Sequence, residues 1–160
     1  KTVTTSPDAP TVVAANLIAC NSVASMVDWL FSGVFDRFPG IQLLYAESQI
    51  GWIPYFVERA DDTWQTHQWA QGEERSQRPP SDYYREHISA CFFKDTVGID
   101  LLDRIGEDNV LFETDYPHQD GTFPRSKQVA EELFGHLPQP TINKIARGNA
   151  IKLLGLDFEP

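Results

Sequence analysis

The stretch Asn109–Asp115, with the sequence NVLFETD, decides the fold class. Its apolar centre is typical of a buried strand, and the stretch ends in a carboxylate. Ile41–Glu47 (IQLLYAE) has the same form, and His87–Phe93 (HISACFF) is a third apolar run. Helical patterns separate these candidate strands. Strands that alternate with helices predict parallel βα units in an α/β fold.

The segments around the strands have the spacing of helices. Apolar residues recur at three- and four-residue steps over residues 23–38, which predicts one long helix that Pro39-Gly40 ends. A second helix is expected from about residue 52 to 69, before a polar loop over residues 71–80. The remaining expected helices are a turn at 81–84, residues 96–105 with Gly106 as C-cap, and residues 123–134 and 139–154.

The chain is too short for a closed barrel. A complete (β/α)8 barrel needs about 250 residues, whereas this chain has 160. Three parallel strands alone would leave two unpaired edges. We therefore expect a partial (β/α)8 TIM-type barrel, roughly its last three strand–helix units. We also expect its edges to pair with the missing half or with another copy, as in a homo-oligomer.

The composition indicates a globular, acidic chain. Apolar residues make up 41% of it, and 23 Asp and Glu against 13 Lys and Arg give a net charge of −10. An acidic protein repels phosphate groups, so neither nucleic acid nor an anionic membrane is an expected partner. We expect no apolar run close to the roughly 20 residues that span a bilayer. Two cysteines, Cys20 and Cys91, favour buried thiols and a cytoplasmic location over a disulfide scaffold.

Two carboxylates stand at equivalent places in the predicted sheet. Glu47 ends the first candidate strand and Asp115 ends the third. Functional groups of parallel α/β sheets gather at the carboxyl ends of the strands. A divalent ion such as zinc accepts carboxylate oxygens, whereas a buried carboxylate without a partner is costly. Either residue alone could be a helix N-cap or a surface charge. The pair favours a metal site.

The segment Thr114–His118 (TDYPH) places two catalytic candidates on one turn. The proline stiffens the turn, so Asp115 and His118 are expected to face the same opening of the barrel, at the carboxyl ends of the strands. Asp115 would bind metal or act as a base, and His118 would hydrogen-bond substrate or shuttle a proton. The alternative is that His118 only braces the loop. Trp52 follows the first carboxylate closely and is a candidate to line a substrate pocket.

Longer segments resemble a known family. They are 32–39 (SGVFDRFP), 43–55 (LLYAESQIGWIPY), 108–118 (DNVLFETDYPH) and the closing 149–156 (NAIKLLGL). They are similar to amidohydrolase-related proteins of the aminocarboxymuconate-semialdehyde decarboxylase type. The resemblance covers nearly the whole chain and corresponds to the C-terminal part of that barrel.

The resemblance implies a (β/α)8 barrel with a divalent metal, usually zinc, at the carboxyl ends of its strands. The family's last-strand aspartate falls on Asp115, as a metal ligand or as the group that activates metal-bound water. Glu47 stands where the family often has a histidine, and related members with glutamate there imply a metal or substrate role. The family's His-x-His and fifth-strand histidine would lie before Lys1, so its zinc site needs histidines that this chain lacks.

These observations predict the C-terminal part of a metal-dependent amidohydrolase-like enzyme, with residues 1–160 as a fragment of one barrel domain. The implied reaction is hydrolysis or non-oxidative decarboxylation of a small carboxylated substrate, and the isolated fragment is expected to be inactive. The alternative is a non-catalytic barrel fragment that acts as an interaction or oligomerisation module. A free-standing α/β binding domain also fits the composition, and it predicts a monomer.

Overall fold

The computed structural model describes residues 6–72 and 76–158. The chain divides into two compact units, each described by itself. A helical unit comprises Lys1–Ile41 and Tyr55–Tyr84, and a sheet unit comprises Gln42–Pro54 and Arg85–Pro160. That residues 1–160 belong to one barrel domain stays a prediction.

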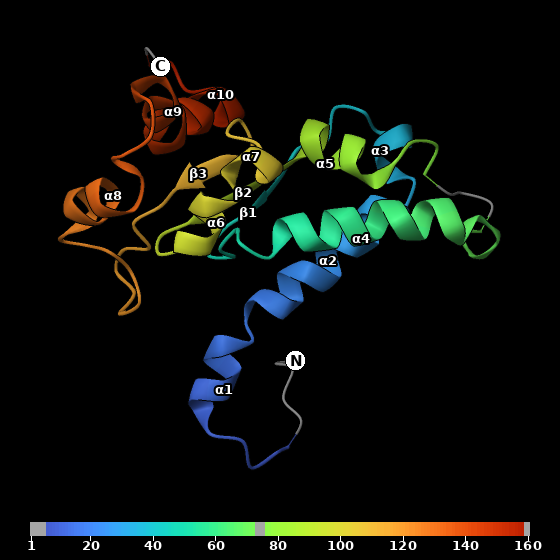
Figure 1. Cartoon of the computed structure of the whole chain (residues 1–160), viewed down its shortest axis with the longest axis horizontal. Coiled ribbons are helices and arrows are strands. Elements are labelled where there is room, and N and C mark those ends of the chain that lie inside the picture. Colours follow the sequence, from blue (N-terminus) through green and yellow to red (C-terminus); the bar gives the residue numbers. More distant parts are fainter. Residues whose placement is uncertain (1–5, 73–75, 159–160) are drawn as a thin grey trace. The chain divides into compact units, whose positions relative to one another are not determined.

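The sheet unit is built on three parallel strands (Figure 1). They are β1 (Leu43–Tyr45), β2 (Ile88–Phe92) and β3 (Val110–Phe112), in the order β1-β2-β3. Leu44 pairs with Ser89, and Ala90 pairs with Val110. The three strands predicted from the apolar runs are confirmed, although each is shorter than its run. The parallel βα units are confirmed with them.

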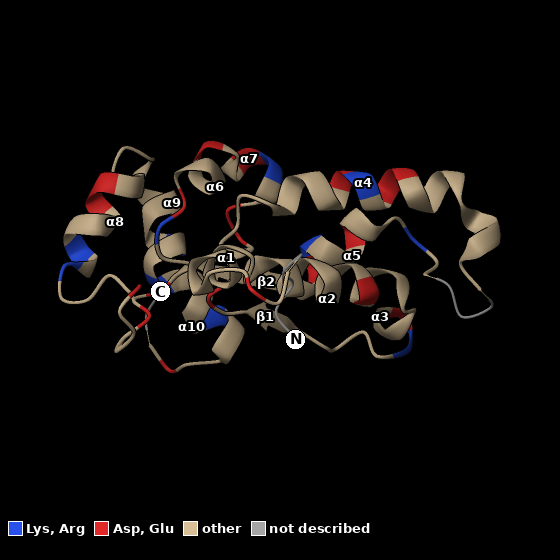
Figure 2. Cartoon of the chain, turned by 90° about the horizontal axis from the view of Figure 1, so that it is seen from below, with Lys and Arg blue, Asp and Glu red and all other residues tan. Residues whose placement is uncertain are grey.

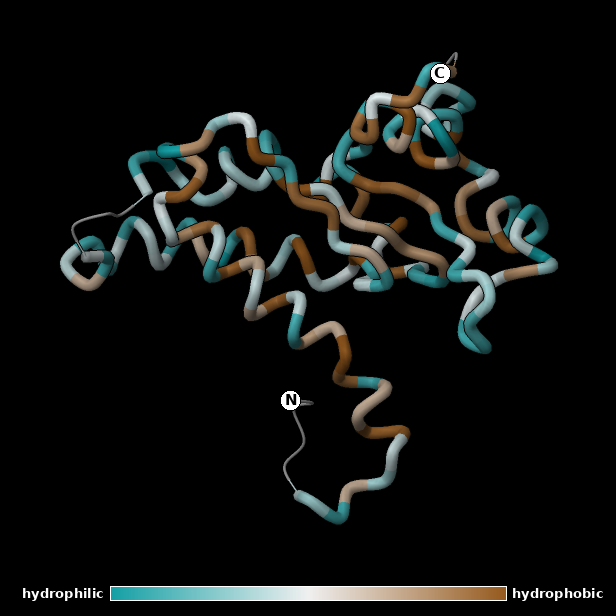
Figure 3. Tube along the Cα trace, turned by 180° about the vertical axis from the view of Figure 1, so that it is seen from behind, coloured by the Kyte–Doolittle hydropathy of each residue, from teal (hydrophilic) through white to brown (hydrophobic). Residues whose placement is uncertain are grey.

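Aromatic side chains of β2 and β3 pack against a helix. Phe92 and Phe112 contact Phe134 of α8 (Ser126–Phe134), with ring centroids 6.0 and 5.4 Å from it. The three rings meet edge to face, the arrangement that aromatic quadrupoles prefer. The hydrophobic stretch of β3 gives way to hydrophilic residues at its carboxyl end (Figure 3). The core of this unit therefore includes the contact between the sheet and α8, and polar residues follow the carboxyl end of β3.

Helices after the sheet are more broken than predicted. The expected helix over 96–105 is two helices, α6 (Thr96–Asp100) and α7 (Leu102–Ile105), and Gly106 ends the second with φ 98°. The expected helix over 139–154 consists of α9 (Gln139–Asn143), a π-helical turn (Lys144–Gly148) and α10 (Asn149–Leu154). The predicted helix over 123–134 begins three residues late, as α8.

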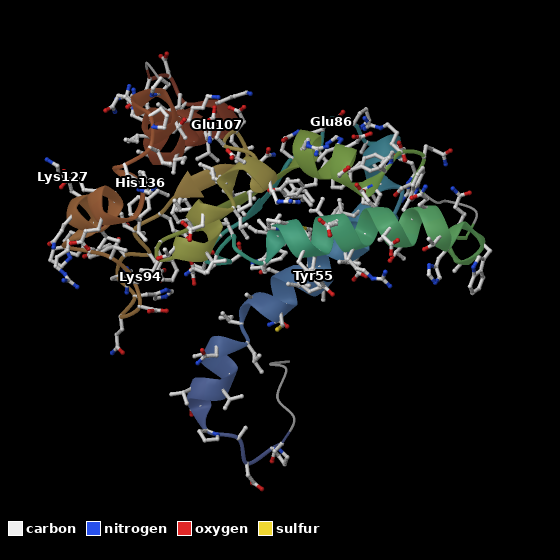
Figure 4. The ribbon with its side chains drawn as sticks, in the orientation of Figure 1. Tyr55, Glu86, Lys94, Glu107, Lys127 and His136 are labelled. Carbon is white, nitrogen blue, oxygen red and sulfur yellow. The ribbon has the colours of Figure 1, made fainter. Side chains whose placement is uncertain are left out.

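Polar contacts hold these last helices to the start of β3. The Asn149 side chain, 6% exposed, donates to the carbonyl oxygens of Glu107 (2.7 Å) and Val110 (2.8 Å). Lys144 Nζ lies 2.6 Å from Glu107 Oε1, and Figure 4 shows Glu107 beside α9 and α10. Hydrogen bonds from Lys144 and Thr141 lower the pKa of Glu107.

The helices of the helical unit are α1 (Thr11–Asn16), α2 (Ala19–Phe31), α3 (Val34–Arg37) and most of α4 (Ile53–Thr66), followed by a 3₁₀ turn (Gln68–Ala70) and the first part of α5 (Pro80–His87). The start of α4 and the residues of α5 after Tyr84 belong to the sheet unit. The predicted helix over 23–38 is wrong in one respect, because Gly33 adopts φ 67° and divides it. α5 is longer than the expected turn and takes in His87, which was expected to begin a strand. Residues 73–75 of the expected loop lie outside the described residues.

A tyrosine organises the helical unit near α3. The Tyr83 hydroxyl donates to Asp36 at 2.6 Å and accepts the backbone N–H groups of Gln77 (3.0 Å) and Arg78 (3.1 Å). Its ring stacks on Phe35 with centroids 5.9 Å apart. Burial, followed by the hydrogen bond to Asp36, raises the pKa of Tyr83. The contacts join segments far apart in sequence.

One sequence expectation about apolar length is wrong. Thr11–Phe31 spans 21 residues and contains an 18-residue stretch with a mean hydropathy of 1.3, of which 6% is buried, so by length and composition it could cross a membrane. Buried core helices and signal segments have the same length and composition. Met26 and Leu30, near its end, are fully buried. The absence of a membrane partner stays a prediction.

Acidic residues are spread over many elements, including α4, α7 and α8 (Figure 2).

Both cysteines are free: Cys91 on β2 is buried as expected, whereas Cys20 on α2 is only half-buried. The expectation of two buried thiols therefore holds for Cys91 alone.

Candidate metal and acid–base site

Three predicted site residues meet at the carboxyl ends of β1 and β3. His118 Nδ1 lies 2.8 Å from Asp115 Oδ1 and 3.7 Å from Glu47 Oε2. One ligand atom from each residue lies within 4.8 Å of the others. Parallel strands end at the same edge of a sheet, which brings residues 68 positions apart together. The structure therefore places Glu47, Asp115 and His118 in one cluster.

The two carboxylates have an unusual backbone. Glu47 has φ 54° and Asp115 has φ 51°, so both residues are left-handed although neither is glycine. This conformation costs roughly 1–2 kcal/mol for an ordinary L-residue, and such positions concentrate at functional sites. The matching conformation at the ends of two strands indicates that the loops are shaped to present these side chains.

Glu113 is a residue of the site that sequence analysis missed. Its Oε1 accepts the backbone N–H of Glu47 at 2.8 Å, which links β3 to the loop after β1. Burial raises the pKa of Glu113, and the nearby charges of Asp115 and Glu47 add to this shift. Burial, with the neighbouring Glu113 charge, also raises the pKa of Cys91 to about 12. The signal in the sequence is a second carboxylate directly after the apolar strand residues, two positions before Asp115.

The loop after β3 is closed on itself. The Thr122 N–H donates to the Thr114 carbonyl at 2.9 Å, and a Cβ on Gly121 would lie 2.6 Å from the same oxygen. Only glycine fits at this approach. Lys94, at the end of β2, donates from Nζ to the Asp120 carbonyl at 2.9 Å, and Figure 4 shows it beside this loop. The turn that carries the aspartate and histidine is thus fixed at its base and its tip.

Trp52 belongs to the loop after β1. Its indole N–H donates to the Ser48 carbonyl at 2.8 Å, and Ser48 itself is 1% exposed. The Ser48 hydroxyl donates to the Tyr45 carbonyl at 3.2 Å. The indole nitrogen therefore shapes the loop that presents Glu47. A contact of the Trp52 ring with substrate stays a prediction.

The donor set suits a divalent cation. It combines two carboxylates with an imidazole nitrogen, which are ligands that Mn²⁺ and Zn²⁺ both accept. The side chain of Asp115 is 8% exposed, whereas those of Glu47 and His118 are 49% and 61% exposed. The cluster is consequently anchored on one side and open to solvent on the other. An open side leaves coordination positions for water or substrate.

Comparisons with known proteins show a family match and similar folds. A family model described as amidohydrolase matches residues 14–156. The structure is similar to 5-carboxyvanillate decarboxylase LigW from Sphingomonas paucimobilis (TM-score 0.70, 20% identity), covering 84% of this chain and 40% of that one. It is also similar to a dihydroxybenzoic acid decarboxylase from a Polaromonas species, which holds manganese and the inhibitor 2-nitroresorcinol (TM-score 0.69, 23% identity, 89% and 42% covered).

A third similar structure is an amidohydrolase from Mycobacterium avium subsp. paratuberculosis, with a TM-score of 0.73 and 24% identity over 90% of this chain. The chain spans 36–42% of the length of these three proteins. Its three-stranded parallel sheet corresponds to part of their fold. The expected fold class, a partial (β/α)8 TIM-type barrel, is confirmed.

Proposed function

Because this chain belongs to the amidohydrolase family, we propose that it forms part of a metal-dependent enzyme acting on a small carboxylated substrate. The reaction would be non-oxidative decarboxylation or hydrolysis. The observation that carries the proposal is the cluster of Glu47, Asp115 and His118 at the carboxyl ends of parallel strands. The names of two similar structures, both decarboxylases of aromatic acids, support a carboxylated ring as substrate.

Glu47 and Asp115 would hold the metal. Their carboxylates come from different strands, so they can bind one ion from two directions. When bound, a divalent ion stabilises negative charge on substrate oxygens and makes a bound water more acidic. Zinc is the metal we propose first, and the manganese in a similar structure makes Mn²⁺ the natural comparison. Histidines from the rest of the protein would complete the zinc site.

His118 would move the proton. Its Nδ1 is within hydrogen-bond distance of Asp115 Oδ1, so the carboxylate fixes the ring and leaves Nε2 to face the substrate. The side chain is 61% exposed, which gives Nε2 access to a bound molecule. In hydrolysis this nitrogen would accept a proton from water. In decarboxylation it would deliver a proton to the carbon that loses carbon dioxide.

Metal stoichiometry tests the proposal directly. The 160-residue chain would be dialysed with Zn²⁺ or Mn²⁺ and then against a weak chelator, and the retained metal would be measured. If Glu47, Asp115 and His118 bind the ion without the upstream histidines, the chain retains about one ion, and Asp115→Ala loses it. Asp120→Ala is the matched control, because this carboxylate lies on the same loop and is 82% exposed.

The control should retain the metal. Equal retention by Asp115→Ala would show that any bound ion lies elsewhere. No retained metal in the wild-type chain would contradict a site formed by these three residues alone. The same measurement on the longer protein would then show whether upstream histidines are required.

The second candidate is a non-catalytic interaction or oligomerisation module. Large apolar side chains are exposed at Leu44 on β1, and at Tyr116 and Phe123 on the loop after β3. Such surfaces favour contact with another chain. Both candidates predict association of the 160-residue chain, so metal content of the longer protein decides between them. A longer protein that holds no metal would support the module over the enzyme.

A further inference from the structure

The Asp95 side chain joins the loop after β1 to the helix after β2. Its Oδ2 accepts the backbone N–H groups of Ile50 (2.7 Å) and Gly51 (2.6 Å). Its Oδ1 accepts the N–H of Gly98 at 2.8 Å and so caps the N-terminus of α6. One carboxylate thus satisfies three backbone donors. Only the last of these bonds is needed for a helix N-cap.

Two glycines allow this close approach. A Cβ on Gly51 would lie 2.9 Å from Asp95 Oδ1, and a Cβ on Gly98 would lie 2.3 Å from Ile50 Cγ1. Neither distance is one that a real side chain shows without a shift of its neighbours. Ile50 is itself fully buried. The loop after β1 therefore rests directly on the first turn of α6, with Asp95 at the contact.

This contact lies close to Glu47. Glu47 precedes Ile50 by three residues, and Gln49 between them is also left-handed, with φ 55°. Two strained residues in one short loop persist only where the surroundings fix the backbone. Half of the Glu47 side chain is exposed, so packing of that side chain contributes little. Besides the bonds of Ser48 and Trp52 within the loop, the backbone is held from outside by the Glu47 N–H bond to Glu113 and the two N–H bonds to Asp95.

We propose that Asp95 is a positioning residue for Glu47, holding the loop after β1 so that the Glu47 carboxylate faces Asp115 and His118. The metal-binding part of this inference rests on the proposed function. Asp95 does not belong to the cluster itself, and it acts through the backbone of Ile50 and Gly51. Its removal should leave Glu47, Asp115 and His118 all present but misplace the first of them.

Asp95→Ser separates this role from helix capping. Serine is as good an N-cap as aspartate, but its single, shorter hydroxyl cannot also reach the Ile50 and Gly51 amides. Asp61→Ser is the matched control, since Asp61 also accepts a backbone N–H, that of Ser81 at 2.8 Å, in the helical unit. Gly51→Ala is an independent second variant, because its Cβ would push the Asp95 carboxylate away.

Two measurements on the full chain decide the outcome. Amide hydrogen exchange reports the Glu47 N–H, and water-proton relaxation reports Mn²⁺ affinity. We expect Asp95→Ser and Gly51→Ala to speed Glu47 exchange by at least about tenfold and to weaken Mn²⁺ binding by about 10–100-fold, the usual effect of an outer-shell change. The Gly98 amide should stay protected in Asp95→Ser, and Asp61→Ser should change neither quantity.

Unchanged Glu47 exchange in Asp95→Ser would overturn the proposal, whatever happens to the metal. If the wild-type chain binds no Mn²⁺, the metal site formed by this chain fails, and Glu47 exchange alone then decides whether Asp95 positions the loop. Faster Glu47 exchange with unchanged Mn²⁺ affinity would also overturn it, because metal binding would then not depend on how the loop places Glu47. The two proposals therefore fail in distinguishable ways.

Discussion

Asp115 and His118 differ in exposure, and this difference separates their expected roles. The Asp115 side chain is 8% exposed and the His118 side chain 61%. In the longer protein that contains this chain, we expect His118→Ala to lower kcat by about 10²–10⁴-fold, the usual contribution of a general acid or base. Metal content should fall far less than in Asp115→Ala. The measurement is steady-state turnover beside metal content.

His67→Ala is the control, because His67 is an exposed imidazole in the helical unit, bonded to Thr66 at 2.8 Å. It should leave turnover unchanged. Full activity in His118→Ala would contradict the proton-transfer role and favour the alternative in which His118 only braces the loop.

Single residues also show where sequence reasoning succeeded. Glu47 and Asp115 were predicted because each follows an apolar strand, and a local pattern is sufficient to see this. Glu113 and Asp95 were not predicted as partners of the first loop. Their bonds join residues 66 and 45 positions apart, and no local pattern encodes such a pairing. A local pattern therefore predicts the residues that end the strands, whereas the residues that hold the loops in place depend on contacts between distant segments.

At the scale of elements, periodicity located helices better than it located their breaks. Apolar spacing continues across Gly33, yet its left-handed backbone divides the helix there. The π-helical turn at Lys144–Gly148 likewise interrupts a run of helical pattern. The break at Gly33 lies in the local backbone, whereas the π-helical turn ends at Asn149, whose side chain donates to the Val110 carbonyl in β3. The helical pattern predicts which residues share a helix face but not where the helix breaks.

The pair of Glu107 and Lys144 predicts how the attachment of these last helices depends on pH. The pKa of Glu107 is lowered in the folded state. Its contribution to the free energy of unfolding is therefore complete above the unfolded pKa of about 4.3 and is lost as pH falls through the folded-state pKa. Hydrogen bonds to Asp108 and Glu107 raise the pKa of Lys144. The contribution of Lys144 to the free energy of unfolding is therefore lost only as pH rises through its folded-state pKa, which lies above the ordinary value of about 10.4.

We therefore expect wild type to exceed Glu107→Gln in free energy of unfolding across neutral pH, and the difference to close below about pH 4. Urea unfolding at a series of pH values measures it. Glu131→Gln on α8 is the control, because Glu131 and Lys127 are an exposed pair 3.9 Å apart. A difference for Glu107→Gln that persists at low pH would contradict an electrostatic origin.

At the scale of the whole molecule, the open sheet determines the expected behaviour in solution. Among the described residues, β1 is an outer strand of a three-stranded sheet, and Leu44 at its centre is 39% exposed. An uncovered apolar edge strand offers unpaired backbone groups to another chain. We therefore predict that the 160-residue chain self-associates, with a sedimentation coefficient that rises with concentration.

Leu44→Lys should weaken this association, because a lysine on an edge strand opposes strand pairing through desolvation of its charge. Val97→Lys is the matched control: Val97 is an apolar residue of α6 that is 60% exposed and lies outside the strands. Analytical ultracentrifugation of the three proteins separates the possibilities. If both variants dissociate equally, exposed apolar surface in general drives association. If the wild-type chain is monomeric at every concentration, the expected pairing of the edge is wrong, and a free-standing α/β domain gains support.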